Sequence, residues 1–176
     1  IVKVRVKATT FSSYEAMIKS TIEPYFRKKG YTLQGLEARH IQQFYLEKLR
    51  TVKPNSVIHY HAVIHQALKY AMKTDLVPQN VAMKVDRPKK NDYQPVFLDA
   101  DELKQLFDVI KGTRLELPVL VAAFYGLRRG EVCGLKWDAI DFERGTITIR
   151  HTVTSLQVDG KTKMYAQDSV KTKSSM

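Results

Sequence analysis

The stretch that decides the fold spans residues 124–141 and reads FYGLRRGEVCGLKWDAID. The apolar segment before it, residues 117–125, predicts a buried helix that runs into Gly126. Because glycine lacks a Cβ, Gly126 permits a sharp turn that presents Arg128 at the end of this helix. Glu131 follows about one helical turn later, close enough to hold or orient the guanidinium. A rigidly mounted arginine suits bidentate contact with a phosphate, so this stretch predicts a phosphate-binding site.

The same stretch resembles the first active-site box of the tyrosine recombinases, the phage-integrase family. The family pattern, Gly-x-Arg-x-x-(Glu/Asp)-x-x-x-Leu-x-Trp, is matched at Gly126, Arg128, Glu131 and the two apolar anchors Leu135 and Trp137. The resemblance implies that Arg128 binds the scissile phosphate of DNA and that Glu131 supports it. Taken alone, the spacing leaves open an ordinary helix-turn-helix with a surface arginine, in which Glu131 forms only a helix salt bridge. Arg129 is either a contact to the DNA backbone or a plain surface charge.

A second basic motif, VKTKSS, occupies residues 170–175. The phage-integrase family carries a catalytic lysine in the β-hairpin after the first box, often as Lys-Thr-x-x-Ser, and this resemblance points to Lys171. A lysine there would donate a proton to the leaving 5′-oxygen. Lys161, Lys163 and Lys173 are rival positions. A solvated, charged hairpin is the alternative without a catalytic role.

The composition limits the class of protein. A length of 176 residues with 44% hydrophobic residues suits one or two domains with a real core. No apolar run approaches the ~20 residues of a membrane span and no secretory signal is visible, so we expect a cytoplasmic protein without a membrane partner. Cys133 is the single cysteine, which excludes an internal disulfide. We expect it to be a small buried residue beside Glu131, with a reactive thiol as the alternative.

The positive charge is concentrated in the first half of the chain. Residues 1–90 hold 17 Lys+Arg and 6 Asp+Glu, whereas residues 91–176 hold 12 of each, so the first half carries the whole net charge of +11. Such an asymmetry favours a polyanion as the partner of the first half. A generically basic soluble domain is the alternative, and a membrane surface is disfavoured because no helix pairs a basic face with a broad aromatic one.

Helical patterns dominate the first half. Residues 1–7 alternate apolar and basic side chains, which predicts a strand or an extended basic entry segment. Residues 12–15, SSYE, read as a capping box that begins the first helix. A third helix opens after Pro54, with Asn55 or Ser56 as its cap. The residues expected to be buried in the second and third helices are Ile41, Phe44, Tyr45, Leu49, Val57, Ile64, Leu68, Ala71 and Met72.

The second half mixes helices and strands. Residues 86–95 read as a linker, because they combine prolines and lysines with no apolar periodicity. Residues 99–102, DADE, form a capping box for a helix that Gly112 ends. After Asp141 the pattern changes to period two. It predicts strands over residues 146–153 and 164–170, with a turn at 158–160.

These elements predict a mainly α fold in three parts: a helical bundle over residues 1–85, a linker over residues 86–95, and helices with a small antiparallel sheet over residues 96–176. This order resembles the phage-integrase family over the whole chain. By that resemblance, the first part is a DNA-binding, core-binding domain and the last is the first part of an α+β catalytic domain. Residues 154–167, expected to join the two strands, are similar to integrases of conjugative transposons and phages of Gram-positive bacteria.

The resemblance also implies that certain polar and basic residues of the helical domain contact DNA. They are Lys7, Thr9 and Ser13 at the entry to the first helix, and Lys53, Asn55 and His59 at the start of the third. Helix N-termini and cations suit phosphate contact, and His and Asn side chains read base edges. Ordinary solvent exposure is the alternative for each. His61 and His65 have the spacing of zinc ligands but no acidic or cysteine companions, so no metal and no other cofactor is expected.

The function implied by the resemblance is site-specific DNA recombination, which integrates or excises a mobile element through a 3′-phosphotyrosine intermediate. The family's His-x-x-Arg box, further His or Trp, and tyrosine nucleophile have no match in this chain. We therefore expect a fragment that binds double-stranded DNA without cleaving it, and full-length protomers that assemble as a homo-tetramer on DNA. The alternatives are a non-enzymatic DNA-binding module or truncated regulator, and a type IB-like topoisomerase.

Overall fold

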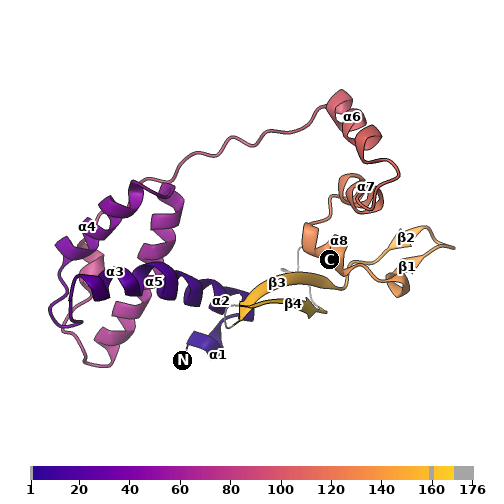
Figure 1. Ribbon diagram of the computed structural model, residues 1–176. Coiled ribbons are helices and arrows are strands. Elements are labelled where there is room, and N and C mark those ends of the chain that lie inside the picture. Colours follow the sequence, from indigo (N-terminus) through magenta and orange to yellow (C-terminus); the bar gives the residue numbers. More distant parts are fainter. Residues whose placement is uncertain (1, 159–160, 169–176) are drawn as a thin grey trace. The chain divides into compact units, whose positions relative to one another are not determined.

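The computed structural model describes residues 2–158 and 161–168. The fold is mainly α, with two small antiparallel sheets, as predicted. The chain separates into two compact units, Ile1–Gln94 (unit 1) and Pro95–Met176 (unit 2), each of which Figure 1 draws with its own helices. Residues 86–99 form neither helix nor strand. Within the described residues, no helix has both the length and the apolar character to cross a membrane.

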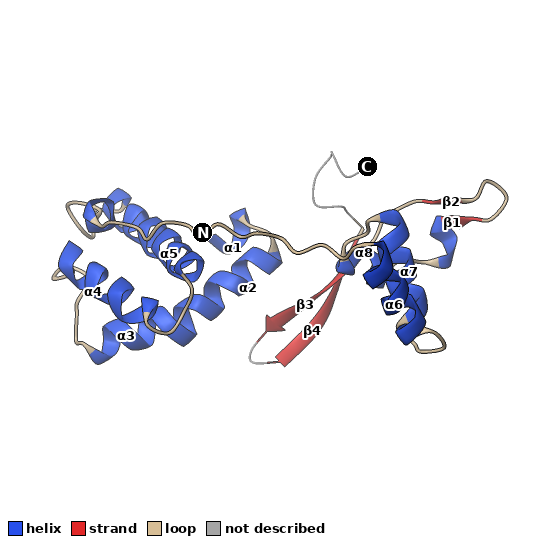
Figure 2. Ribbon diagram, turned by 90° about the horizontal axis from the view of Figure 1, so that it is seen from above, coloured by secondary structure: helices blue, strands red, loops and turns tan. Residues whose placement is uncertain are grey.

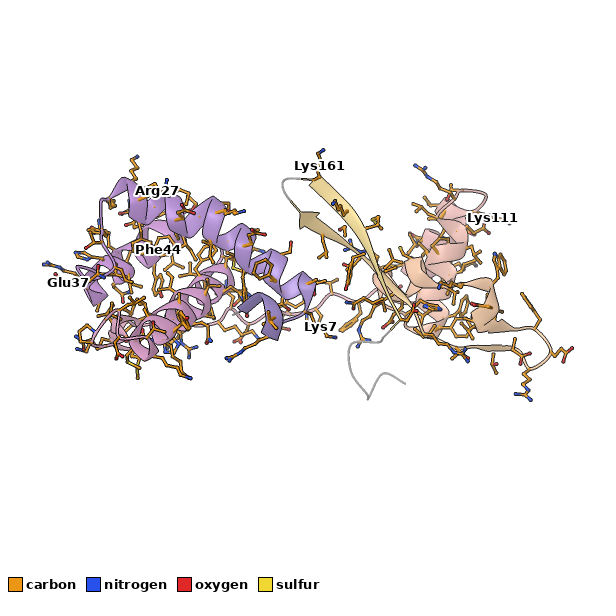
Figure 3. All side chains as sticks on the ribbon, turned by 90° about the horizontal axis from the view of Figure 1, so that it is seen from below. Lys7, Arg27, Glu37, Phe44, Lys111 and Lys161 are labelled. Carbon is orange, nitrogen blue, oxygen red and sulfur yellow. The ribbon has the colours of Figure 1, made fainter. Side chains whose placement is uncertain are left out.

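Unit 1 is built from helices around one apolar core. In chain order they are α1 (Val2–Arg5), α2 (Ala8–Met17), the π-helix η1 (Ile18–Ile22), α3 (Glu23–Lys28), α4 (Ala38–Leu49), α5 (Pro54–Lys73) and the 3₁₀ helix η2 (Val81–Lys84). Phe44 and Tyr45 of α4 are fully buried, and Phe44 lies between the helices of the unit in Figure 3. The core residues are Ile41, Phe44, Tyr45, Val57, Ile64, Leu68, Ala82 and Val85. The second and third helices thus bury the faces that their periodicity predicted, except that Met72 is exposed and Leu49 is half-buried.

The beginning of unit 1 differs from the prediction. Residues 2–5 form a helical turn, so both the strand and the extended segment predicted there are wrong. A strand needs a partner for its backbone groups, and a helical turn satisfies them locally. Helix α2 begins at Ala8, so the predicted capping box at residues 12–15 is wrong as well. The Ser13 hydroxyl lies inside the helix and donates to the Thr9 carbonyl over 3.0 Å.

A proline explains the π turn within the first long helix. Helices α2, η1 and α3 follow one another without a break, and Pro24 lies at the start of α3. Proline has no N–H, and its ring crowds the carbonyl four residues earlier. The preceding turn is widened, because the Glu23 N–H donates to the carbonyl of Ile18, five residues back. The helix therefore continues past Pro24 to its end before Gly30, which has φ of 69°.

Helix α5 begins one residue earlier than its predicted cap. Pro54 is its first residue and Lys53 is the N-cap, so neither Asn55 nor Ser56 caps it. The fixed φ of proline suits the first helical position, where a missing N–H costs nothing. The cap prediction is wrong because the proline itself starts the helix.

Unit 2 contains short helices and two hairpins. The elements are α6 (Ala100–Ile110), α7 (Glu116–Tyr125), α8 (Arg129–Gly134), the 3₁₀ helix η3 (Trp137–Ala139), β1 (Ile140–Asp141), β2 (Thr146–Ile147), β3 (Thr152–Val158) and β4 (Lys161–Gln167). The predicted capping box of α6 is confirmed, because the side chains of Asp99 and Glu102 accept each other's backbone N–H groups at 2.9 and 3.0 Å. Strands β1 and β2 pair antiparallel, as do β3 and β4.

The β3–β4 hairpin is longer than predicted. Thr152 pairs with Gln167 at its base and Val158 with Lys161 at its end, and Figure 2 shows the two strands as one extended ribbon pair. Residues 154–158 and 161–167 therefore belong to the paired strands of the hairpin and do not join two strands, which corrects that prediction. Strand β4 was placed too late because six of its seven residues are exposed and give no period-two apolar signal. Of the predicted turn, residues 159–160 lie outside the described residues.

Candidate phosphate-binding site

Gly126 makes the predicted bend. It follows the last residue of α7 in the left-handed conformation, with φ of 63° and ψ of 27°. Arg128 then adopts extended backbone as the N-cap of α8. The helix before the bend is not buried, however: no residue of α7 is buried in the part of unit 2 that the structure describes. The glycine, and not a buried helix, therefore sets the direction in which Arg128 leaves the chain.

Glu131 holds Arg128 through two hydrogen bonds. Its Oε2 accepts the Arg128 backbone N–H at 2.8 Å, and its Oε1 accepts the guanidinium Nη1 at 3.0 Å. One carboxylate thus caps the N-terminus of α8 and orients the side chain that leaves it. The Glu131 side chain is 8% exposed, whereas that of Arg128 is 61% exposed. Arg128 is therefore anchored by Glu131 while most of its side chain is exposed to solvent.

The carboxylate of Glu131 stays charged at neutral pH. The hydrogen bond from the Arg128 backbone N–H is the main cause that holds the pKa of Glu131 below its ordinary value. Burial opposes this shift, and the Arg128 guanidinium adds to it. A charged carboxylate keeps both bonds to Arg128 in place at neutral pH.

Two glycines bring α8 close to strand β3, which the sequence analysis did not foresee. A Cβ on Gly130 would lie 3.0 Å from the Val153 carbonyl oxygen, and one on Gly134 would lie 2.8 Å from that of His151. Both contacts are to backbone, which cannot turn aside as a side chain can. The spacing of these two glycines, one helical turn apart in residues 130–134, was the signal available in the sequence.

The apolar anchors and the cysteine differ from their predictions. Leu135 is half-buried, but Trp137 is 77% exposed and stacks on Phe142, with ring centroids 6.5 Å apart. The prediction that Trp137 is a buried anchor is therefore not met within the described residues. Cys133 is exposed, so the predicted burial is wrong; the positions of α8 that come close to the backbone of residues 151–153 are Gly130 and Gly134. Arg129 is exposed beside Arg128.

The predicted catalytic lysine, Lys171, lies outside the described residues, as does Lys173. Of its rivals, Lys161 and Lys163 are exposed on β4, and Lys161 lies at the end of the hairpin in Figure 3. At the base of the same hairpin, the ring of His151 on one side contacts the carboxylate of Asp168 on the other.

The six predicted DNA contacts of unit 1 lie at the starts of its two longest helical segments. Lys7 and Lys53 are exposed N-cap residues of α2 and α5, and neither uses its side chain as a cap. Thr9 and Ser13 are one turn apart on α2. On α5, His59 is exposed one turn after Asn55, whose side-chain Oδ1 is buried without a hydrogen-bond partner within the described residues. The described residues hold no group of three or more His, Cys, Asp or Glu that could bind a metal.

Comparison with known families identifies the chain. The family described as "Phage integrase family" matches residues 96–175, and "Phage integrase, N-terminal SAM-like domain" matches residues 2–49. The chain belongs to the phage integrase family. The first match contains Arg128 and Glu131, and the second contains Lys7, Thr9 and Ser13.

Curated relatives of this integrase-family chain are recombinases and integrases by name. Tyrosine recombinase XerA of Pyrococcus furiosus is 32% identical over 149 residues, which cover 80% of this chain and 50% of that protein. Prophage integrase IntR of Escherichia coli K12 is 27% identical over 134 residues, which cover 74% of this chain and 32% of IntR. The chain therefore spans between about a third and a half of the length of these relatives.

Solved structures share the fold. The Tn1549 transposon integrase in complex with circular intermediate DNA matches with a TM-score of 0.70 and 20% identity, over 93% of this chain and 54% of that one. A lambda integrase (75–356) dimer bound to a COC′ core site matches with a TM-score of 0.65 and 17% identity, over 92% of this chain and 53% of that one. At these identities the likeness concerns the fold alone.

Proposed function

We propose that this chain is the DNA-binding part and the first catalytic part of a site-specific tyrosine recombinase that acts on double-stranded DNA. Residues 1–85 would be the core-binding domain, residues 86–95 the linker and residues 96–176 the first part of the catalytic domain. The observation that carries the proposal is the guanidinium of Arg128, held by a buried carboxylate and open to solvent. Family membership and the DNA-bound structures of related fold support it.

In this proposal, Arg128 stabilises charge on the scissile phosphate. Attack of a protein hydroxyl on a phosphodiester increases the negative charge on the non-bridging oxygens, and a fixed guanidinium donates to two of them. Loss of one such donor raises a barrier by roughly 3–4 kcal/mol. Glu131 would position Arg128 by the two bonds described above, and Arg129 would contact a neighbouring backbone phosphate.

Lys171 is proposed as the general acid that protonates the leaving 5′-oxygen. The β4 strand ends at Gln167, so the basic motif directly follows the hairpin whose other strand packs on α8. No His-x-x-Arg box or matching tyrosine nucleophile occurs among the 176 residues. We therefore propose that this chain by itself binds DNA without cleaving it, and that recombination by protomers of the whole protein proceeds in a homo-tetramer on DNA.

The affinity for DNA is proposed to come mainly from unit 1. Its positive charge favours a polyanion, and the candidate contacts are Lys7, Thr9, Ser13, Lys53, Asn55 and His59. Cations and the exposed N-terminal turns of α2 and α5 suit backbone phosphates, and His59 and Asn55 carry groups that read bases.

The test begins with the chain as it is. Selection from a random double-stranded DNA library, followed by fluorescence anisotropy, should yield a duplex that the chain binds at least about 1,000-fold more tightly than a scrambled one. In a whole recombinase that contains this chain, Arg128→Ala should retain that binding and lose the covalent adduct on a nicked suicide substrate.

Other outcomes would contradict the proposal. If the chain prefers none of the selected duplexes, the proposed sequence-specific binding is wrong. Normal adduct yield with Arg128→Ala would remove Arg128 from the reaction. Specific binding without any adduct by the whole protein would favour a non-enzymatic module, and relaxation of supercoiled DNA without site preference would favour a topoisomerase.

A further inference from the structure

An open groove runs along one side of unit 1, beside α5. It has a volume of about 820 Å³ and lies between α5 and the segment that leaves the unit, residues 82–90. Its lining combines the apolar side chains Ile58, Met83 and Val85 with basic ones. The basic and imidazole side chains that line it are His61, His65, Arg87, Lys89 and Lys90.

The cations of this groove have no acidic partner. Arg87, Lys89 and Lys90 form no ion pair or side-chain hydrogen bond with any described residue. Asp86 is the single carboxylate in the lining, and its backbone N–H is held by the Gln42 side chain at 3.2 Å. Elsewhere in unit 1, Lys19, Arg27 and Arg39 are paired with glutamates at 2.5–2.9 Å. The groove therefore gathers positive charge with which no carboxylate of the described residues forms an ion pair.

The histidines add hydrogen-bonding groups to this charge. The hydroxyl of the buried Tyr45 lies 2.8 Å from His61 Nδ1 and shares a hydrogen bond with it. Burial, followed by the charges of Arg87 and His65, lowers the pKa of His61, so the ring is neutral at pH 7 and carries one N–H. His65 stacks on His61 with ring centroids 5.8 Å apart.

We propose that this groove binds the phosphodiester backbone of double-stranded DNA. Lys and Arg side chains without an acidic partner are donors that suit phosphate oxygens, and the apolar side chains of the lining suit the deoxyribose between them. No Phe, Tyr or Trp lines the groove, so it lacks a platform on which bases stack. The proposal rests on the proposed function, because it adds a contact site to the same DNA-binding unit.

The test compares two triple variants of the 176-residue chain. The groove variant replaces Arg87, Lys89 and Lys90 with Gln. The control replaces Lys19, Arg27 and Arg39 with Gln, which removes the same charge from residues that are already paired; Arg27 projects outward from unit 1 in Figure 3. Binding to one selected duplex is measured by fluorescence anisotropy from about 50 to 200 mM salt, the range in which phosphate contacts are most visible.

The groove variant should bind about tenfold or more weakly at about 100 mM salt, and the slope of log affinity against log salt should become shallower by about 2–3. The control should change affinity by less than about threefold and keep its slope. All six positions are exposed, and far-UV circular dichroism verifies that both variants are folded.

The experiment distinguishes an error in the groove proposal from an error in the proposed function. A wild-type chain that binds no duplex would refute the proposed function. A wild-type chain that binds its duplex, with equal losses and equal slopes in the two variants, would overturn the groove alone, because net charge would then account for the whole effect.

Discussion

At the scale of single residues, the buried carboxylate of Glu131 has the largest predicted effect. It accepts a backbone and a side-chain hydrogen bond from Arg128, and both would lose a charged acceptor in Glu131→Gln. We expect this variant to lower the unfolding free energy of unit 2 by about 1–3 kcal/mol. Trp137 is the single tryptophan of the chain, so its fluorescence during urea unfolding reports on unit 2. Glu143→Gln, which changes an exposed carboxylate in the same unit, should have no measurable effect.

The same carboxylate predicts a pH dependence. Because the pKa of Glu131 is lower in the folded than in the unfolded chain, its contribution to stability is complete above the unfolded pKa of about 4.3 and disappears as pH falls through the folded pKa. The difference in unfolding free energy between the wild-type chain and Glu131→Gln should be constant from about pH 5 to 7 and shrink below about pH 4.5. If the difference in unfolding free energy grows as the pH falls, the pKa of Glu131 is not lowered by folding.

The sequence predicted the Arg128–Glu131 pair correctly but not its surroundings. Residue type and spacing determine that a carboxylate three positions later reaches a guanidinium. Whether Trp137 and Cys133 are buried depends on which side of α8 meets β3, and residue spacing within one segment carries no such information. The exposure of both residues could therefore not be derived from the box itself.

At the scale of elements, the contact between α8 and β3 is set by Gly134. In an ordinary helix Gly→Ala stabilises by about 0.5–1 kcal/mol, but here the added Cβ would lie 2.8 Å from the His151 carbonyl oxygen and 2.9 Å from the Thr152 Cα. We therefore expect Gly134→Ala to destabilise unit 2 by about 1–3 kcal/mol. The test is whether the unfolding free energy measured in urea falls or rises in Gly134→Ala. The control is Cys133→Ala at an exposed position of the same helix, whose unfolding free energy should stay within about 0.5 kcal/mol of wild type.

Elements with a buried face were the predictable ones. Helices α4 and α5 bury most of the apolar positions that their helical spacing predicted. Helix α6 begins at the capping box predicted from residues 99–102. Residues 4–7 and strand β4 were misjudged because none of residues 4–7 is buried and almost all of β4 is exposed, so their pattern reflects no core. The alternating residues 1–7 resemble a strand only in spacing, and in the described part neither sheet includes any of them.

At the scale of the whole molecule, charge and linker composition predict two domains joined by residues 86–95. The structure forms two compact units that divide between Gln94 and Pro95, and the predicted domain bounds stay a prediction. The location of Lys89 and Lys90 on a groove was not predictable, since it depends on how the segment after η2 returns along α5. That return is a tertiary contact between residues distant in the sequence.

The exposed stretch between the units predicts where proteases act first. Residues 89–99 are exposed and lack helix and strand, whereas Pro88 blocks trypsin after Arg87, so the first cuts of the free chain should follow Lys89 or Lys90. Mass spectrometry of early digests should find two products divided at these sites, before cuts at Lys111 or Arg114 in the turn after α6. If the groove holds DNA, a saturating duplex should slow the cuts at Lys89 and Lys90 more than those at Lys111 and Arg114. Equal protection at all four sites would mean that the duplex acts by general shielding, and a first cut inside α4 or α5 would contradict the compact core of unit 1.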